Sequence, residues 1–323
     1  MAQSSSRAEK QELLVPHIDY PLVARPRSPM YLMHMYLTRK PPTIVGEYIE
    51  HYSKKGEIVL DPFCGSGVTV AEALKHERKA IGTDLNSLAT FVTRMTVIPV
   101  DLNQFQRAFD RVEENVKEKI TELYKTVCPK CKREATIICT IWMREKEAER
   151  PLEVRYYCPK CKKRSSKRPS REDVELIEEL EKREIPYWYP RARLGYPNSS
   201  PFLSGHKAKY VNELFTKRNL VALSILYHEI DSLDEGLVKE LTKFTFSSMV
   251  LLASKMTPVR KTRPFSSHVS RPHYWLPPEF MESNVWRLFI RAFKGRQGVL
   301  KGKIDSMEKI KHYKEAKAFD NFE

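Results

Sequence analysis

The chain has 323 residues, a length that predicts about two domains of ~150 residues each. Its apolar content of 41% and charged content of 30% are typical of globular proteins and exclude disorder of the whole chain. The longest apolar run, at about residues 249–253, is far shorter than the ~20 residues that a membrane span needs. The polar start MAQSSSRAEK does not resemble a signal peptide. We therefore predict a cytoplasmic protein without membrane contact, whose six cysteines form no disulfides.

The charge balance indicates a polyanionic partner. Lys and Arg number 56 against 41 Asp and Glu, which gives a net charge of +15. A solvated basic surface is one explanation, and neutralisation of nucleic-acid phosphates is the other. Residues 128–171 hold fourteen Lys and Arg and five Asp and Glu, a net of +9, so more than half of the surplus lies in this one segment. That concentration favours a phosphate contact.

The first regular elements follow an arm of about 27 residues. Residues 58–60 are apolar and rich in β-branched side chains, which predicts a strand. Residues 68–74 predict a helix, and residues 80–82 predict a second strand. Strand, glycine-rich turn, helix and strand form one βαβ unit, which is typical of a parallel sheet.

The turn in this unit has features of a cofactor site. Gly65 and Gly67 leave room for a ligand to approach the backbone, and the helix that follows offers free N–H groups to an anion. Asp84 lies seventeen residues after Gly67, directly behind the second strand, where a carboxylate can accept hydrogen bonds from both ribose hydroxyls of an adenosine-type cofactor. Position 70 is Val, so the GxGxxG fingerprint is not met, and no GxxxxGK[ST] loop occurs. Both absences argue against nicotinamide, flavin and ATP.

The stretch VLDPFCGSGVTVAEALKHERKAIGTDLN resembles the cofactor signature of S-adenosylmethionine-dependent DNA amino-methyltransferases, which methylate adenine N6 or cytosine N4. Upstream, YLTRKPP at residues 36–42 is similar to that family's second cofactor motif. Cys64 fits as a packing residue rather than a nucleophile. The resemblance implies a methionine pocket of Asp61, Pro62, Phe63, Gly65, Ser66 and Gly67, a ribose held by Asp84, an adenine near Leu85 and Asn86, and a carboxylate end near Lys40 and Pro41.

Two CPKC sequences predict a metal site. Cys128 and Cys131 are separated by twenty-six residues from Cys158 and Cys161, and four thiolates at this spacing suit tetrahedral Zn²⁺. A redox CxxC or a pair of buried thiols is the alternative, which the duplication disfavours. Because four thiolates close the coordination shell, the expected zinc is structural, and Cys139 is a spare buried thiol. A zinc ribbon at this place also resembles one branch of adenine-specific DNA methylases.

The remaining chain predicts helices at about residues 105–123, 171–184, 210–230, 235–256 and 285–293. A basic, aromatic loop precedes the last of these. Phosphate clamps with stacking rings are what recognition of a strand or a flipped base requires, and packing of the rings in a core or an interface is the alternative. The residues expected to contact DNA there are Arg260, Lys261, Arg263, Arg271, His273, Tyr274 and Trp275.

The expected fold class is α/β, with a partial Rossmann-like methyltransferase sheet, an inserted zinc ribbon and a mainly helical C-terminal region. The expected boundaries are 1–29 for an arm, 30–125 for an S-adenosylmethionine-binding half-domain, 126–170 for the zinc ribbon, 171–300 for target recognition and 301–323 for a basic tail.

The family's acceptor motif, Asp/Asn/Ser-Pro-Pro-aromatic, does not occur in the sequence. The nearest stretches are 28–31 (SPMY), 200–202 (SPF) and 276–279 (LPPE), and each departs from it. Two or three predicted parallel strands would also leave open sheet edges. We therefore expect a DNA methyltransferase subunit that binds cofactor and double-stranded DNA, while a second polypeptide, or the missing part of a longer gene product, supplies the acceptor motif. An RNA methyltransferase and a non-catalytic zinc-containing nucleic-acid-binding protein are the alternatives.

Overall fold

The computed structural model describes residues 15–145, 148–196, 208–269 and 275–316, and these residues form two compact units. Of the described residues, the first unit comprises 15–27, 38–97 and 309–316. The second unit comprises Ser28–Leu37 and Ile98–Glu308. No helix in the described part is both long and apolar enough to cross a membrane.

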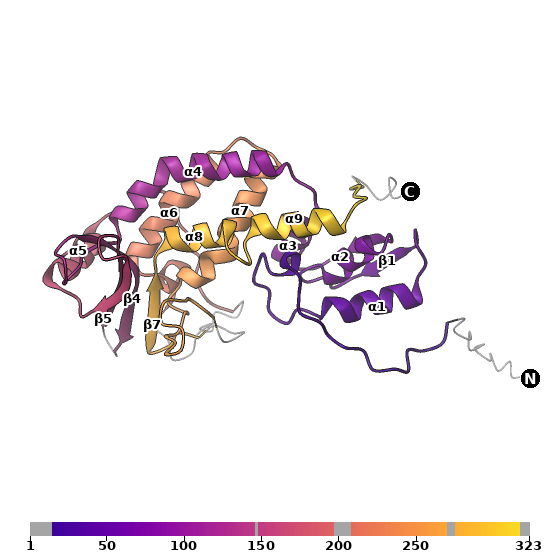
Figure 1. The fold of residues 1–323 in the computed structure, drawn as a ribbon, viewed down its shortest axis with the longest axis horizontal. Helices are drawn as coiled ribbons and strands as arrows, with labels where there is room; N and C mark the ends of the chain where they lie inside the picture. The colour runs from indigo at the N-terminus through magenta and orange to yellow at the C-terminus, as the bar shows by residue number, and fades with distance from the viewer. Residues whose placement is uncertain (1–14, 146–147, 197–207, 270–274, 317–323) are drawn as a thin grey trace, which may run out of the picture. The chain divides into compact units, whose positions relative to one another are not determined.

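The first unit is built around a parallel pair of strands (Figure 1). The pair runs in register from Ile58 opposite Lys79 to Asp61 opposite Gly82. The elements, in chain order, are α1 (Pro42–Tyr52), β1 (Ile58–Asp61), α2 (Val68–Lys75), β2 (Lys79–Gly82) and α3 (Ser87–Val97). Helix α2 connects and contacts both strands, and α1 packs against α2. The βαβ unit expected from the sequence is confirmed.

One face of strand β1 is uncovered in the first unit. Ile58 and Leu60 are 54% and 60% exposed, whereas Asp61 is buried. In the described part of the chain this sheet consists of β1 and β2 alone. Parallel sheets normally bury both faces, so the apolar residues of β1 are suited to contact with a further layer of structure.

Glycines allow the helices of the first unit to approach the strands. Gly67 has a φ of 73°, and a Cβ built there would lie 2.5 Å from the side chain of Thr93 on α3. A Cβ on Gly82 would lie 2.6 Å from Val70 on α2. A larger residue at either position would therefore separate packed elements.

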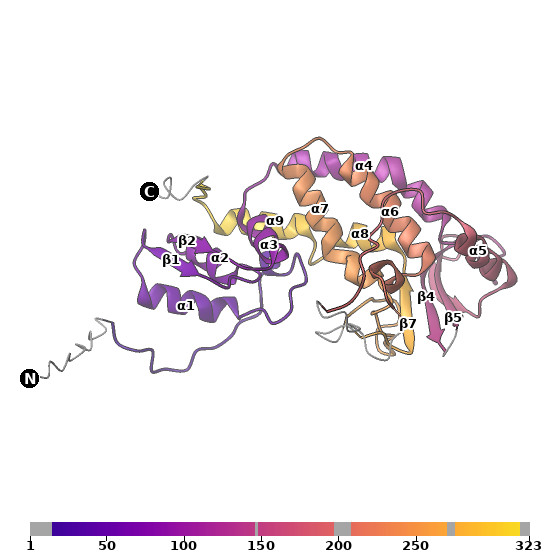
Figure 2. The same cartoon turned by 180° about the vertical axis from the view of Figure 1, so that it is seen from behind.

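Helices dominate the N- and C-terminal parts of the second unit. Helix α4 begins after Asp101, whose carboxylate caps it by accepting the N–H groups of Asn103 and Gln104. Figure 2 shows α4, α6 and α7 side by side, and all three contact α8. The elements are η1 (Pro29–Tyr31), α4 (Leu102–Glu122), α5 (Arg171–Lys182), η2 (Val211–Leu214), α6 (Lys217–Asp231), α7 (Leu237–Val250), η3 (Leu251–Ala253), α8 (Val285–Lys294) and α9 (Val299–Lys309).

The second unit also contains an antiparallel sheet. Its strands are β3 (Lys125–Val127), β4 (Glu134–Arg144), β5 (Glu149–Cys158), β6 (Lys163–Lys167) and β7 (Glu279–Ser283). The order is β3-β4-β5-β6, and β7 pairs with the later half of β4, from Cys139 opposite Ser283 to Met143 opposite Glu279. The segment expected as a zinc ribbon is thus joined to the C-terminal part by a strand that the sequence did not indicate.

A buried polar cluster attaches β7 to its neighbours. The Glu282 carboxylate accepts hydrogen bonds from the Trp142 indole (3.0 Å) and the Thr216 hydroxyl (2.5 Å). It also lies 3.3 Å from the guanidinium of Arg218, and all these side chains are buried. Moving β7 away from β4 would leave the buried charges of Glu282 and Arg218 without their partners, which is energetically costly. The cluster therefore holds β7 in place on β4.

Several helices differ in extent from the sequence expectation. Residues 210–230 form the short η2 and then α6, because Thr216 turns the chain and its hydroxyl caps the N–H of Asn219. Helix α7 ends at Val250 rather than near residue 256. Helix α9 lies largely within the segment expected as a basic tail, and its Lys303 is fully buried.

Candidate functional site

Asp84 links the ends of the two parallel strands. Its carboxylate accepts the N–H of Gly65, from the glycine turn, and the N–H of Asn86, each at 2.9 Å. The bond from Asn86 and, to a smaller extent, the bond from Gly65 lower the pKa of Asp84 because they stabilise its charged form. Asp84 is therefore a carboxylate at neutral pH, placed at the carboxyl end of the sheet, where ligands of parallel α/β sheets bind.

Two large apolar side chains are open to solvent in this region, one in the glycine turn and one directly after Asp84. Phe63 is 83% exposed and Leu85 is fully exposed, and the next residue, Asn86, is exposed as well. Exposed aromatic and aliphatic side chains beside a carboxylate provide apolar surface for a ring and acceptors for hydroxyl groups.

The other end of the turn carries charges of both signs. Asp61 is buried, accepts the N–H of Phe63 (3.1 Å) and lies 4.0 Å from the ammonium of Lys40. The guanidinium of Arg39 donates to the Ser66 hydroxyl at 2.9 Å. Sequence reasoning missed Arg39, although it lies inside the stretch 36–42 that suggested this end of the site.

The remaining residues expected at the site lie in the turn or next to it, and each contributes to the local structure. Pro41 is exposed and precedes α1, and the carbonyl of Pro62 accepts the Thr83 hydroxyl at 3.1 Å. Gly67 caps α2 in a left-handed conformation without a side-chain cap, so the first N–H groups of α2 have no partner from a capping side chain. Cys64 is buried, and burial raises the pKa of its thiol, which agrees with a packing role.

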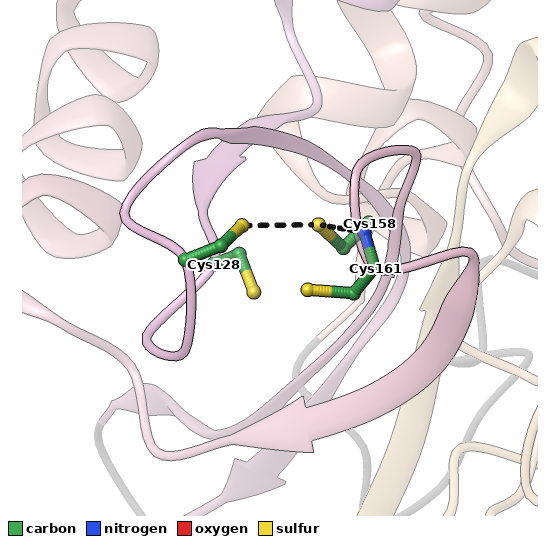
Figure 3. A group of neighbouring side chains, drawn as sticks. Cys128, Cys158 and Cys161 are labelled. Carbon is green, nitrogen blue, oxygen red and sulfur yellow. Dashed lines mark hydrogen bonds between the residues drawn. The ribbon is translucent and has the colours of Figure 1, made fainter.

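The four cysteines of the two CPKC sequences come together in the second unit. Their Sγ atoms all lie within 4.8 Å of one another, and the sulfurs of Cys131 and Cys158 are 3.5 Å apart. Figure 3 shows the sulfurs of Cys128, Cys158 and Cys161 directed toward a common centre between two loops. Zn–S bonds of about 2.3 Å place tetrahedral sulfurs about 3.8 Å apart, so this spacing is compatible with a zinc site.

The protonation behaviour of this cluster follows from its backbone and its crowding. Backbone N–H groups of Cys131 and Lys130 lower the pKa of Cys128 to about 6, because they stabilise its thiolate. Hydrogen bonds with the thiols of Cys131 and Cys158 raise the pKa of Cys161 to about 12. A divalent cation would relieve the repulsion among four thiolates. Cys139 is buried outside the cluster, as expected.

The basic loop before β7 is only partly described. Arg260 is half-buried, Lys261 and Arg263 are exposed, and Trp275 is half-buried. Burial, followed by the charges of Arg260 and Arg263, lowers the pKa of His268, so both arginines lie near this ring. The other residues expected to contact DNA lie outside the described residues; they are Arg271, His273 and Tyr274.

Two of the three stretches closest to the acceptor motif are packed. Residues 28–31 include η1, where Met30 and Tyr31 are 1% and 3% exposed. In residues 276–279, Leu276 and Pro277 are buried and Glu279 begins β7. The third stretch, residues 200–202, lies outside the described residues. Neither packed stretch forms an open loop that could receive a base.

Comparison with known proteins relates the amino-terminal part of the chain to one family. Residues 5–90 match the family described as DNA methylase. The amino-terminal part of the chain resembles DNA methylases. This stretch contains the βαβ unit, the glycine turn and Asp84, so the resemblance to a DNA methyltransferase family is supported.

Two curated relatives point the same way. The chain is 33% identical over 94 residues to the type II methyltransferase M.MvaI of Kocuria varians, an alignment that covers 28% of this chain and 20% of that protein. It is 45% identical over 60 residues to the DNA adenine methyltransferase YhdJ of Escherichia coli strain K12, covering 18% and 20%. The matching segments thus span about a fifth of each relative. No solved structure matches the chain.

Proposed function

We propose that this chain is the cofactor- and DNA-binding part of an S-adenosylmethionine-dependent DNA methyltransferase that methylates adenine N6 or cytosine N4. One observation carries the proposal. In the segment that matches DNA methylases, the Asp84 carboxylate is fixed by the Gly65 N–H at the carboxyl ends of two parallel strands. Adenine and cytosine remain equal candidates for the target base.

The residues at this edge fit S-adenosylmethionine. A carboxylate has about four acceptor positions, and the N–H groups of Gly65 and Asn86 use two of those on Asp84, which leaves capacity for a ribose diol. Phe63 and Leu85 offer apolar surface to the adenine. Asp61 would attract the ammonium of the methionine end, and Arg39 and Lys40 would attract its carboxylate. When bound, S-adenosylmethionine supplies the methyl group.

A second polypeptide segment is proposed to complete the site. The amine must lie in line with the methyl group, so positioning is a main catalytic term, and the printed sequence has no acceptor motif for it. The uncovered face of β1 and an apolar groove of about 570 Å³ support a docking place. The groove is lined by Ile44 and Tyr48 of α1 and by Ile58 of β1.

The cysteine cluster is proposed to hold one structural zinc ion. Four thiolates leave no open coordination position, so the ion would stabilise the two loops and take no part in methyl transfer. Basic residues of the loop before β7 are proposed to contact DNA from the same unit, with Lys261 and Arg263 as its exposed described cations.

Labelled S-adenosylmethionine tests the proposal and separates it from its alternatives. The chain should bind the cofactor and, together with the polypeptide that carries an Asp-Pro-Pro-Tyr-type motif, should transfer label to duplex DNA. Transfer to tRNA or rRNA instead would favour an RNA methyltransferase. Cofactor binding without transfer, even beside that partner, would favour a non-catalytic zinc-containing nucleic-acid-binding protein.

A further inference from the structure

Each cysteine loop presents exposed lysines beside its metal-type ligands. The two loops have the same sequence, Cys-Pro-Lys-Cys-Lys, and all four lysines are exposed. Among the residues that the structure describes, no carboxylate forms an ion pair with any of them. We call this set, Lys130, Lys132, Lys160 and Lys162, the knuckle surface.

Two of these lysines occupy a backbone conformation that favours glycine. Lys132 and Lys162 have φ values of 58° and 51°, and each directly follows the second cysteine of its loop. The turn at Lys132 is closed by its N–H, which donates to the Cys128 carbonyl at 2.9 Å. Glycine adopts such a φ without steric cost, whereas a side chain with a Cβ does not. The backbone conformation at these two positions therefore does not account for the presence of lysine.

The metal-type cluster places the two loops next to each other. All four sulfurs lie within 4.8 Å, so the tips that carry the lysines are neighbours. Hydrogen-bonded strands lead into each loop: Cys128 N–H donates to the Arg133 carbonyl, and Cys158 pairs with Lys163. Because the turns are rigid, binding a polyanion would order only the lysine side chains and not the backbone that carries them.

The composition of the loops selects the kind of polyanion. Positions 129–133 and 159–163 contain no aromatic residue, whereas proteins that bind single strands rely on stacking rings. Cations without stacking rings suit the phosphate backbone of a duplex. We propose that the knuckle surface binds the phosphate backbone of duplex DNA, independently of base sequence. The inference rests on the proposed function, because the partner is taken to be DNA.

The experiment uses glycine at the two left-handed positions. The double variant Lys132→Gly/Lys162→Gly removes two charges while relieving the backbone, so melting temperature and zinc content should stay equal or rise. Binding of a fluorescent 30-base-pair duplex, followed by anisotropy over a range of salt concentrations, should weaken about tenfold at low salt, and the salt slope should fall by about 2. The control Lys119→Ala/Lys301→Ala removes two exposed lysines elsewhere in the second unit and should change binding far less.

Each other outcome contradicts a defined part of the account. A wild-type chain that binds no duplex would refute the DNA part of the proposed function itself. A wild-type chain that binds, with an unchanged double variant or an equally weakened control, would overturn only the knuckle surface. Loss of zinc in the glycine variant would also overturn the knuckle surface, because the two lysines would then be needed to keep the cysteine loops folded. Tighter binding of a matched RNA duplex, with the same loss, would exclude DNA as the partner.

Discussion

Asp84 has two tasks at the level of single residues. It accepts the N–H groups of Gly65 and Asn86, which holds the turn, and it keeps acceptor capacity for the proposed ribose contact. A substitution there affects both the shape of the turn and the contact with ligand.

Asp84→Ala should weaken S-adenosylmethionine binding about ten- to a hundredfold, as expected when a charge-assisted hydrogen-bond acceptor is lost. Asp84→Asn should lose less, because an amide oxygen still accepts an N–H. Calorimetric titration measures both, with Asp110→Ala, an exposed acidic residue of α4, as the control. Wild-type affinity in a folded Asp84→Ala protein would remove Asp84 from the site.

Lys303 makes the second unit sensitive to pH. It is fully buried, its ammonium donates to the carbonyl of Ile98, and burial lowers its pKa to about 7. The unfolded chain keeps a lysine pKa near 10.5, so between pH 7 and 10.5 the unfolded state binds more protons. Stability should therefore rise with pH across this window.

The variant Lys303→Met tests this pH dependence, because methionine has a similar length to lysine and carries no charge to be buried. The variant should be more stable than the wild type at pH 6, and the difference in melting temperature should shrink toward pH 10. Melting curves at both pH values decide the matter. If the difference in melting temperature between the variant and the wild type does not depend on pH, Lys303 has the same protonation state in the folded and the unfolded chain, and the prediction is wrong.

The sequence was informative about residues whose role depends on local spacing. Asp84 behind a strand and the four cysteines were expected, and the structure brings the cysteines together. Arg39 and Lys303 were not singled out, because the contact of Arg39 with Ser66 and the burial of Lys303 depend on tertiary packing. Neither fact has a local signal in a chain with 56 lysines and arginines.

Gly67 determines how closely α3 packs on the glycine turn. Gly67→Ala should destabilise the first unit, because it combines an unfavourable φ with an overlap at 2.5 Å from Thr93. Gly56→Ala is the matched control, since Gly56 has a φ of 84° and nothing within 4 Å of the added Cβ. Chemical unfolding should show a larger loss for Gly67→Ala, by more than about 1 kcal/mol. Equal losses would show that only the backbone conformation matters at Gly67.

The cysteine loops should depend on metal. We expect one zinc ion per chain, and Cys158→Ser should release it and disorder the β3–β4 and β5–β6 loops while the first unit still binds cofactor. Metal analysis and circular dichroism measure the two effects. Cys139→Ser is the control, because Cys139 is buried outside the cluster and should leave the zinc content unchanged. A stable disulfide between two of the four cysteines, without metal, would refute the zinc site.

At the level of elements, local patterns predicted more than long-range pairing did. The βαβ unit and the amphipathic α4 follow from periodicity over a few residues, and both were expected. The pairing of β7 with β4 joins residues about 140 positions apart through the buried Glu282 cluster. A five-residue strand of mixed polarity such as EFMES gives little signal from its sequence alone.

The whole molecule divides its proposed tasks between two units. The family match ends at residue 90 and covers the turn with its carboxylates, whereas the cysteine cluster and the basic loop lie in the second unit. The printed sequence contains no acceptor motif. In the described first unit, one face of β1 is uncovered. Binding the methyl donor and DNA does not by itself accelerate transfer, because only interactions made in the transition state do so.

Methyl transfer by the purified chain, alone and with its partner, tests the central claim most directly. The measurement is the label incorporated into duplex DNA from labelled S-adenosylmethionine, with cofactor binding followed in the same samples. We predict cofactor binding without methylated bases for the chain alone, and methylated adenine or cytosine once the polypeptide with the Asp-Pro-Pro-Tyr-type motif is added. Sustained methylation by the isolated 323-residue chain would contradict the need for a second polypeptide. Absence of cofactor binding in both samples would contradict the methyltransferase assignment.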